Sequence, residues 1–344
     1  MYEILTKRAG IYLGTTTIEL FPNIAPLHTA NFDSLVNTSF YDSTAFHRVI
    51  PGFMIQGGDP NSRSGPISTW GLGDPSQPTV NAEFTAARHI RGRLSAARDT
   101  SINSANSQFF ICVATAAWLN GQYSVYGRVT SGMDIVDTIV NAPRDASDNP
   151  LQKIEMFITY IGSNDTVPVA PTLNLPVNGS VGASTAKPLN WIAQSDGIIY
   201  HVEVSTDSTF ATTFKSVDVG TNAYTVTGLS YGNKYFWRVR TNNGGHFSPY
   251  SEVRHFYVSG TSIDESATLS VNVYPNPSTG KFLFSNLEDE NTIEILDITG
   301  RIIYKTVTKN ASITIDLTSQ AKGIYFYNIR VKNKKAKQGK IILQ

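Results

Sequence analysis

The stretch FHRVIPGFMIQGGDP, residues 46–60, places a single arginine among apolar side chains. Arg48 is followed by Phe53 and Met54, and Gln56 stands directly before two glycines. His47 precedes the arginine, but no second ligand or nucleophile is near it in sequence, so we expect a structural histidine satisfied by the backbone. One fixed cation in an apolar groove suits a reaction that needs charge stabilisation at a single atom and no covalent intermediate.

Two further stretches accompany the first in a fixed order: LSAARDTSINSANSQFFIC, residues 94–112, and WLNGQYSVYG, residues 118–127. Taken together, and over nearly all of residues 10–162, they make the chain similar to the cyclophilin family of peptidyl-prolyl cis/trans isomerases. The resemblance implies an eight-stranded antiparallel barrel closed by two helices. It also implies an enzyme that acts on proline-containing polypeptides.

The implied reaction explains why one arginine is sufficient. Rotation about an X-Pro peptide bond crosses a barrier of about 18–20 kcal/mol, because twisting the C–N bond forfeits amide resonance. In the twisted state the proline nitrogen regains a lone pair that can accept a hydrogen bond. A guanidinium held at that nitrogen binds the twisted state more strongly than the planar one, and only such differential binding accelerates a reaction.

The resemblance assigns one catalytic residue and an apolar pocket for the proline ring. Arg48 matches the catalytic cation of the family, and arginine suits the role because it stays charged and presents a rigid fork of donors. The positions that match the family's proline pocket are Phe53, Met54, Phe110 and Leu119. Taken singly, each apolar residue would be interpreted as core and Arg48 as a surface arginine. Only their joint occurrence favours a site.

The remaining substrate-binding positions follow from the same resemblance. Gln56 matches a side chain that holds a substrate carbonyl, while Ala97, Arg98 and Gln108 match the groove for the residues before proline. Arg98 replaces a frequent asparagine. Tyr123 stands where many members have histidine, and a tyrosine offers a comparable donor from a flat ring. Trp118 matches the indole that borders the pocket in cyclosporin-binding members, so cyclosporin is a candidate ligand.

Short strands and two helical stretches are predicted around these motifs. Residues 11–22 alternate in a way that predicts a strand pair, and residues 109–115 and 123–130 are strand candidates. Residues 25–36 predict a helix whose face carries Leu27, Ala30, Phe32 and Leu35. A second helix is predicted over 132–140, with Met133, Val136 and Ile139 or Val140 on one face.

A linker rich in Pro, Asn and Ser near residues 163–180 predicts a domain boundary. We expect an isomerase domain over 1–165, a sandwich over 166–260 and a further small sandwich over 261–344. In the middle segment, strands recur at intervals of about 8–12 residues. Trp191, Leu229 and Tyr235 make it similar to a fibronectin type III domain. The expected fold is therefore mainly β, a cyclophilin-like barrel followed by two small immunoglobulin-like sandwiches.

The last segment carries YPNPSTG, DITGR, GIYF and a Lys-rich hairpin in that order. This pattern resembles the type A sorting domain of proteins exported by the type IX secretion system. The resemblance implies the secretion machinery as a partner and a final place outside the cell or on its surface. The amino terminus shows no apolar signal segment. We therefore expect a truncated start or a processed form.

Bulk composition excludes several other function classes. The chain has 344 residues, 41% of them apolar and 16% charged, and a net charge of +1. Such a chain has no overall field that would draw it to nucleic acid or anionic lipid. The single cysteine, Cys112, excludes an intrachain disulfide and a multi-cysteine metal site. No apolar run reaches the roughly 18 residues of a membrane span. We expect neither a metal nor an organic cofactor.

Three functions remain open on the sequence. The first is an active, exported prolyl isomerase with the middle sandwich as spacer or binding module. The second is a module that grips proline-containing peptides with weak turnover, since the pocket that binds is also the pocket that catalyses. The third is a surface adhesin whose sandwiches carry the function, which exposed aromatic patches would favour.

Overall fold

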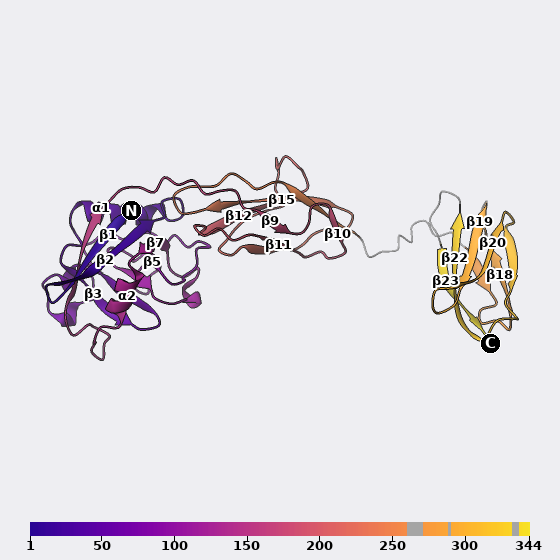
Figure 1. Cartoon of the computed structure of the whole chain (residues 1–344), viewed down its shortest axis with the longest axis horizontal. Coiled ribbons are helices and arrows are strands. Elements are labelled where there is room, and N and C mark those ends of the chain that lie inside the picture. The colour runs from indigo at the N-terminus through magenta and orange to yellow at the C-terminus, as the bar shows by residue number, and fades with distance from the viewer. Residues whose placement is uncertain (260–270, 288–289, 332–336) are drawn as a thin grey trace. The chain divides into compact units, whose positions relative to one another are not determined.

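The computed structural model describes residues 1–259, 271–287, 290–331 and 337–344. The chain forms two compact units, Met1–Ser259 and Gly260–Gln344. A closed barrel and a sandwich make up the first unit, and smaller sheets make up the second (Figure 1). The predicted mainly β fold class is confirmed.

Eight strands close the barrel in the order β1-β2-β7-β5-β6-β4-β3-β8, and each neighbouring pair is antiparallel. Closure leaves no free strand edge. The strands are β1 (Tyr2–Arg8), β2 (Ile11–Leu20), β3 (Thr44–Ile50), β4 (Met54–Asp59), β5 (Arg93–Ala96), β6 (Phe109–Cys112), β7 (Val125–Ser131) and β8 (Ile154–Tyr160). The helices are α1 (Pro26–Asn37), α2 (Met133–Val140) and the 3-10 turns η1 (Pro60–Ser62), η2 (Ile67–Thr69) and η3 (Ala117–Leu119).

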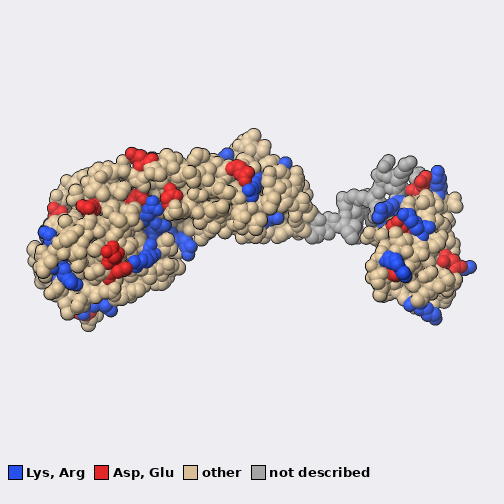
Figure 2. All heavy atoms as spheres, viewed as in Figure 1, with Lys and Arg blue, Asp and Glu red and all other residues tan. Residues whose placement is uncertain are grey.

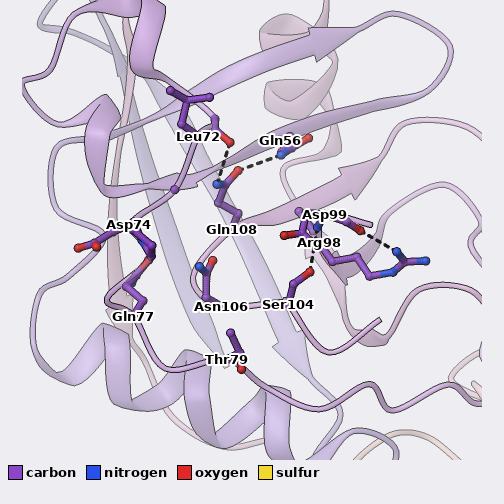
Figure 3. A pocket seen from close by; sticks show the side chains of 14 residues that line it. Gln56, Leu72, Asp74, Gln77, Thr79, Arg98, Asp99, Ser104, Asn106 and Gln108 are labelled. Atoms are coloured by element: carbon purple, nitrogen blue, oxygen red, sulfur yellow. Dashed lines mark hydrogen bonds between the residues drawn. The ribbon is translucent and has the colours of Figure 1, made fainter. Parts of the chain in front are cut away.

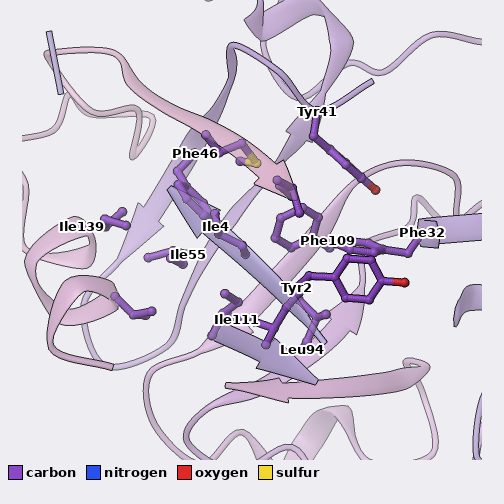
Figure 4. Packing of buried hydrophobic residues seen from close by; sticks show 14 of the residues in the cluster. Tyr2, Ile4, Phe32, Tyr41, Phe46, Ile55, Leu94, Phe109, Ile111 and Ile139 are labelled. Atoms are coloured by element: carbon purple, nitrogen blue, oxygen red, sulfur yellow. The ribbon is translucent and has the colours of Figure 1, made fainter. Parts of the chain in front are cut away.

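The barrel interior is packed with side chains, as Figure 4 shows. Phe32 of α1 meets Tyr41 and Phe109, with ring centroids 5.1 Å and 5.8 Å away. Ile55 and Ile111 from neighbouring strands are fully buried in the same cluster. Because small barrels of eight strands are filled in this way, the functional side chains lie on the outer surface.

Two details of the predicted elements are wrong. Residues 11–20 form one continuous strand, β2, and not a strand pair. Gly14 lies within it because a Cβ there would collide with the side chain of Ile135 on α2. Helix α1 exists as predicted, but it buries His28, Phe32 and Val36 while Leu27 is exposed. The buried face of α2 is confirmed.

Helix α1 tolerates a buried histidine because a carboxylate meets it. The Nδ1 of His28 lies 2.7 Å from Oε2 of Glu83. The same carboxylate accepts hydrogen bonds from the backbone N–H groups of Leu27 and His28, both at 3.0 Å. These donors have no partner within the helix. A polar residue on the inner face makes a count of apolar positions assign the wrong buried face to the helix.

The sandwich pairs a five-stranded sheet, β10-β16-β15-β12-β13, with a three-stranded sheet, β14-β11-β9. Trp191, Tyr235 and Trp237 fill the core between them. The hydroxyl of Tyr235 accepts a hydrogen bond from the N–H of Ser230 at 2.9 Å, which ties β15 to the preceding loop. Strand bounds are β9 (Leu173–Leu175), β10 (Ser180–Gly182), β11 (Lys187–Trp191), β12 (Ile199–Ser205), β13 (Lys215–Val219), β14 (Ala223–Val226), β15 (Lys234–Asn242) and β16 (Arg254–Val258).

The second unit contains a three-stranded sheet, β17-β18-β21, and a four-stranded sheet, β20-β19-β22-β23. Phe282, Phe284 and Ile293 are fully buried in its core. The sequence also predicts a second polar linker, VSGTSIDESATLS, over residues 258–270. This linker and the tip of the predicted Lys-rich hairpin fall largely outside the described residues. Strand bounds are β17 (Asn272–Tyr274), β18 (Lys281–Ser285), β19 (Asn291–Leu296), β20 (Ile302–Thr308), β21 (Ser312–Asp316), β22 (Gly323–Val331) and β23 (Lys337–Leu343).

The surface carries charges of both signs. On the face drawn in Figure 2, Lys and Arg are interspersed with Asp and Glu. Within the described ranges, no helix has the length and apolar character needed to cross a membrane.

Candidate active site

An irregularity in β3 turns Arg48 outward. Its register with β4 shifts on both sides of Phe46, and Phe46 and His47 are consecutive buried residues. Such a bulge re-aims the side chains that follow it. Arg48 is consequently exposed, and it pairs in register with Gln56 on β4. Gln56 in turn pairs with Phe110 on β6. These three side chains thus come from adjacent strands of the barrel wall.

A cavity of about 150 Å³ opens beside Arg48. Its floor is apolar, since Met54, Phe110 and Leu119 are all less than one-tenth exposed. A cavity of about this volume accommodates a ring of benzene size, so a prolyl ring fits. The residues that line it are Arg48, Phe53, Met54, Gln56, Ala97, Arg98, Phe110, Leu119 and Tyr123.

A larger hollow of about 490 Å³ adjoins the first, since Gln56, Ala97 and Arg98 line both. In Figure 3, Gln108 lies between Gln56 and the glycine loop at 71–73. Gln56 donates a hydrogen bond to Oε1 of Gln108 at 3.0 Å, and Gln108 donates to the carbonyl of Gly71 at 3.2 Å. The two hollows therefore form one groove, and the side-chain amide of Gln108 is held in place beside both of them.

Trp118 lies at the rim. Its side chain is 65% exposed, and it is not among the residues that line the cavity. Its ring centroid is 5.6 Å from that of Phe53. Gln108 lines only the larger hollow. Nine of the eleven predicted site residues thus line the smaller cavity. Of the other two, Gln108 lines the larger hollow and Trp118 lies at the rim of the smaller one.

Arg98 and Tyr123 are in direct contact. The Arg98 guanidinium lies 4.5 Å from the Tyr123 ring centroid. It also donates to the carbonyls of Gln122, at 3.1 Å and 3.3 Å, and of Asp99, at 2.7 Å. Tyr123 packs edge-on against Phe110 with centroids 5.9 Å apart. The Arg98 cation therefore holds the Tyr123 wall of the cavity, a contact that no local sequence pattern indicates.

Charge is distributed unevenly along the groove. None of the described residues that line the smaller cavity is acidic, and in the described part of the chain Arg48 makes no ion pair. The larger hollow carries Asp74 and Asp99. Hydrogen bonds from Ser76 and Ser104, respectively, hold the pKa of these two carboxyls below its usual value. The groove is thus cationic at one end and mixed at the other.

Asp59 is a functional position that sequence reasoning missed. It is fully buried, and its Oδ2 accepts hydrogen bonds from the N–H groups of Gly71 and Gly73. Its Oδ1 accepts from the N–H of Asn61 at 3.1 Å, which caps η1. The carboxylate therefore fixes the glycine loop that bounds the groove. The sequence does carry one indication of this role: Asp59 directly precedes Pro60, and an aspartate followed by proline is typical of a helix cap.

His47 is buried beneath that same loop. Its ring nitrogens make no regular hydrogen bond, contrary to the expected backbone satisfaction, although the backbone of Ala45 interacts with it. Burial lowers the pKa of His47 to about 4, opposed by Asp59 and Ala45 and aided by Arg48. The imidazole is therefore neutral near pH 7, and it does not compete with Arg48 as a cation.

The buried cysteine and the acidic groups offer no further chemistry. Cys112 is fully buried, and burial raises the pKa of its thiol to about 12. Across the residues with described positions, no group of three or more His, Cys, Asp or Glu side chains could hold a metal ion.

Comparison with known proteins agrees with this geometry. A family model described as cyclophilin type peptidyl-prolyl cis-trans isomerase/CLD matches residues 2–160. A probable peptidyl-prolyl cis-trans isomerase of Brucella suis biovar 1 is 45% identical over 152 residues, which are 42% of this chain and 78% of that protein. A peptidyl-prolyl cis-trans isomerase of Acinetobacter baylyi is 39% identical over 163 residues, 45% of this chain and 84% of that protein.

A solved structure covers about half of the chain. It is a cyclophilin type peptidyl-prolyl cis-trans isomerase of Cryptosporidium parvum in the presence of the dipeptide Ala-Pro, 32% identical, covering 47% of this chain and 99% of that one with a TM-score of 0.41.

The rest of the chain matches two other family models. A fibronectin type III domain model matches residues 169–257, and a secretion system C-terminal sorting domain model matches residues 272–344. The order of the three matches is the predicted one, and the sorting domain indicates type IX secretion to the cell surface or the medium. With its catalytic region on residues 2–160, the chain belongs to the cyclophilin-type peptidyl-prolyl cis-trans isomerases and is such an enzyme.

Proposed function

We propose that Arg48 catalyses X-Pro rotation by donating a hydrogen bond to the proline nitrogen of the twisted peptide. One observation carries this role: Arg48 is an exposed cation that makes no ion pair with any described carboxylate, at the wall of a cavity with an apolar floor. A guanidinium that is not already neutralised keeps its full donor strength for the substrate. A prolyl ring seated over the apolar floor would shield that hydrogen bond from water and strengthen it, and the donor needs no reorganisation during the reaction.

The neighbouring residues supply positioning. The prolyl ring enters the cavity over Met54 and Phe110, both of which are buried and fixed by packing. Gln56 holds a substrate carbonyl with its amide, and its orientation is set by the hydrogen bond to Gln108. The residues before proline extend past Ala97 into the larger hollow. Substrates are proline-containing polypeptides, and rotation requires only binding and one directed donor.

Cyclosporin is a proposed ligand of the same groove. Trp118 contacts Phe53 at the cavity rim and leaves most of its indole exposed. A rigid aromatic at the edge of an apolar cavity offers a large contact area at a low cost in conformational entropy. Cyclosporin should therefore compete with Ala-Pro peptides, and Trp118→Ala should weaken its binding.

The decisive measurement compares Arg48→Ala and Arg48→Lys in the full chain. Loss of one directed donor should lower kcat/KM for an Ala-Pro peptide by about 10² to 10³-fold. Lysine should recover only part of it, because its point charge lacks the planar fork. Peptide binding, measured by calorimetry, should change far less. Arg63→Ala is a matched control, since Arg63 is an arginine outside both hollows.

The outcomes separate two functions. If turnover in Arg48→Ala stays within a fewfold of wild type, the proposed mechanism is wrong. If the wild type binds peptide but does not accelerate rotation, the groove serves as a grip for proline-containing partners.

We also propose that the chain is exported and held at the cell surface, with its C-terminal unit read by the type IX machinery. The support is the sorting-domain match over residues 272–344 and the well-packed core of that unit, which gives the machinery a folded signal. The catalytic groove lies wholly within Met1–Ser259, so export does not require its residues.

A further inference from the structure

The barrel and the sandwich share a small hydrophobic core. It combines Phe21, Ile24, Ala87 and Val125 of the barrel region with Ile198 and Ile199 at the start of β12. All six residues are less than one-tenth exposed. Burial of aliphatic and aromatic side chains away from water is favourable. The contact is therefore a packed apolar interface between the barrel and the sandwich.

Glycines let the two backbones approach closely. A Cβ at Gly220 of the sandwich would collide with the carbonyl oxygen of Ala86, although the backbone of Gly220 is not in the left-handed region. A Cβ at Gly244 would collide with the ring of Phe21. Any side chain at either position would force the barrel and sandwich apart.

Polar contacts surround the apolar cluster. The N–H of Asn23 donates to the carbonyl of Gly244 at 2.8 Å, and its side chain donates to the carbonyl of Gly245 at 2.5 Å. Arg128 pairs with the buried Glu19 at 2.7 Å and reaches the carbonyl of Asp196 at 3.3 Å. These contacts fix orientation as well as distance, because directional bonds hold the interface on more than one side.

The interface continues into the wall behind the proline cavity. Two residues after Ala87, the fully buried His89 stacks on Phe110 with ring centroids 6.0 Å apart and planes 15° apart. Its Nε2 lies 3.0 Å from Oγ of Ser95, and its N–H donates to Oδ1 of Asn120 at 2.8 Å. Asn120 directly follows Leu119 of the cavity.

A second connection runs through β7. Val125, a member of the shared core, lies two residues after Tyr123 of the cavity wall. Ser124, between them, accepts hydrogen bonds at its carbonyl from Oγ of Ser95 at 2.8 Å and from the N–H of Ala96 at 3.0 Å. Segments 86–89 and 123–125 thus both join the sandwich contact to residues of the cavity.

We propose that the sandwich is a fixed structural partner of the barrel that positions the rear wall of the proline cavity through residues 86–89 and 123–125. On this view it is neither a spacer nor a separate binding module. His89 and Val125 are positioning residues, since they act on the substrate only through Phe110, Leu119 and Tyr123. The proposal does not depend on the role given to Arg48.

The test uses Gly220→Ala in the full chain, with Gly182→Ala as matched control. Gly182 lies in the same sandwich, has ordinary backbone angles, and a Cβ there meets only the flexible end of Lys187. Hydrogen exchange is read at the N–H groups of Ala96 and Ala116, which donate to Ser124 and His89, respectively. Turnover of an Ala-Pro peptide is read well below the unfolding temperature, so that the folded fraction does not change.

Gly220→Ala should raise exchange at both amides severalfold and lower kcat/KM severalfold, mainly through KM. Gly182→Ala should change neither. Ile198→Ala, which removes interface contacts without pushing on Ala86, should act in the same direction and remains informative if Gly220→Ala does not fold. Unchanged exchange and turnover in both interface variants would overturn the proposal, even if their overall stability fell. Exchange responds whether or not the wild type turns over, so failure of the Arg48 mechanism would be seen separately.

Discussion

Arg98 and Tyr123 are two groove positions at which the sequence resemblance indicates a departure from the family's frequent residues, and the structure places them in contact. Neither departure is interpretable alone, because a surface arginine and a surface tyrosine each have many explanations. Together they form one unit, in which a guanidinium anchored on two backbone carbonyls faces the ring that packs on Phe110.

This contact predicts a measurable coupling. An exposed cation–π pair contributes about 0.5–1 kcal/mol, so Arg98→Met and Tyr123→Leu should not be additive in kcat/KM. The double variant should be about two- to fivefold more active than the product of the single effects implies. The control is Arg144→Met, which removes the ion pair with Asp148. Its effect on kcat/KM should be additive with that of Tyr123→Leu. If the effects of Arg98→Met and Tyr123→Leu on kcat/KM are also additive, the contact between the two side chains does not contribute to activity.

At the scale of elements, β3 and the glycine loop at 71–73 form one assembly. A Cβ at Gly71 would lie 3.4 Å from the imidazole of His47, and the buried Asp59 holds the loop from below. The neutral state of His47 is therefore part of the packing beneath the groove. Protonation would place a charge beside Arg48 without a regular hydrogen-bond partner, which is costly in a buried position.

A loss of stability in mild acid follows. The pKa of His47 is 6.5 in the unfolded chain and about 4 in the folded one. Between those pH values the unfolded state binds more protons, so the free energy of unfolding falls as pH falls, by up to about 3 kcal/mol. Urea titrations from pH 7 to pH 4 should show this slope, and His47→Phe should reduce it. His246→Gln is the control. An equal slope in His47→Phe and wild type would contradict the assignment.

The elements were predictable where local pattern decides them. Helix α2 repeats its apolar residues at helical spacing, and the strands around Phe110 and Trp237 are short apolar or alternating runs, so their positions follow from the sequence. The buried face of α1 was not predictable, because Glu83 compensates for a histidine in an apolar position. The single strand β2 was missed for a related reason: the glycine within it, Gly14, leaves room for the side chain of Ile135 on α2, which is distant in sequence.

At the scale of the whole molecule, the residues that line the smaller cavity were predictable as a set because three local motifs carry them. The interface between barrel and sandwich was not. Phe21 and Gly244 meet across more than two hundred residues of chain, and neither stands in a periodic pattern that points to the other. Contacts of this kind are decided by the final packing of two finished sheets, and a linker rich in Pro and Asn gives no sign of them.

The residues proposed for catalysis and those proposed for export lie in different parts of the chain, and this arrangement predicts how each variant is secreted. The groove and the sorting domain belong to different compact units. In a bacterium with type IX secretion, a tagged chromosomal copy that keeps all upstream sequence should place the full chain at the surface or in the medium. Removal of residues 272–344 should retain the chain inside the outer membrane. Arg48→Ala should be exported like wild type, because the machinery reads the C-terminal unit and not the groove. Surface location of the truncated chain, or retention of Arg48→Ala, would contradict a signal that resides in the C-terminal unit alone.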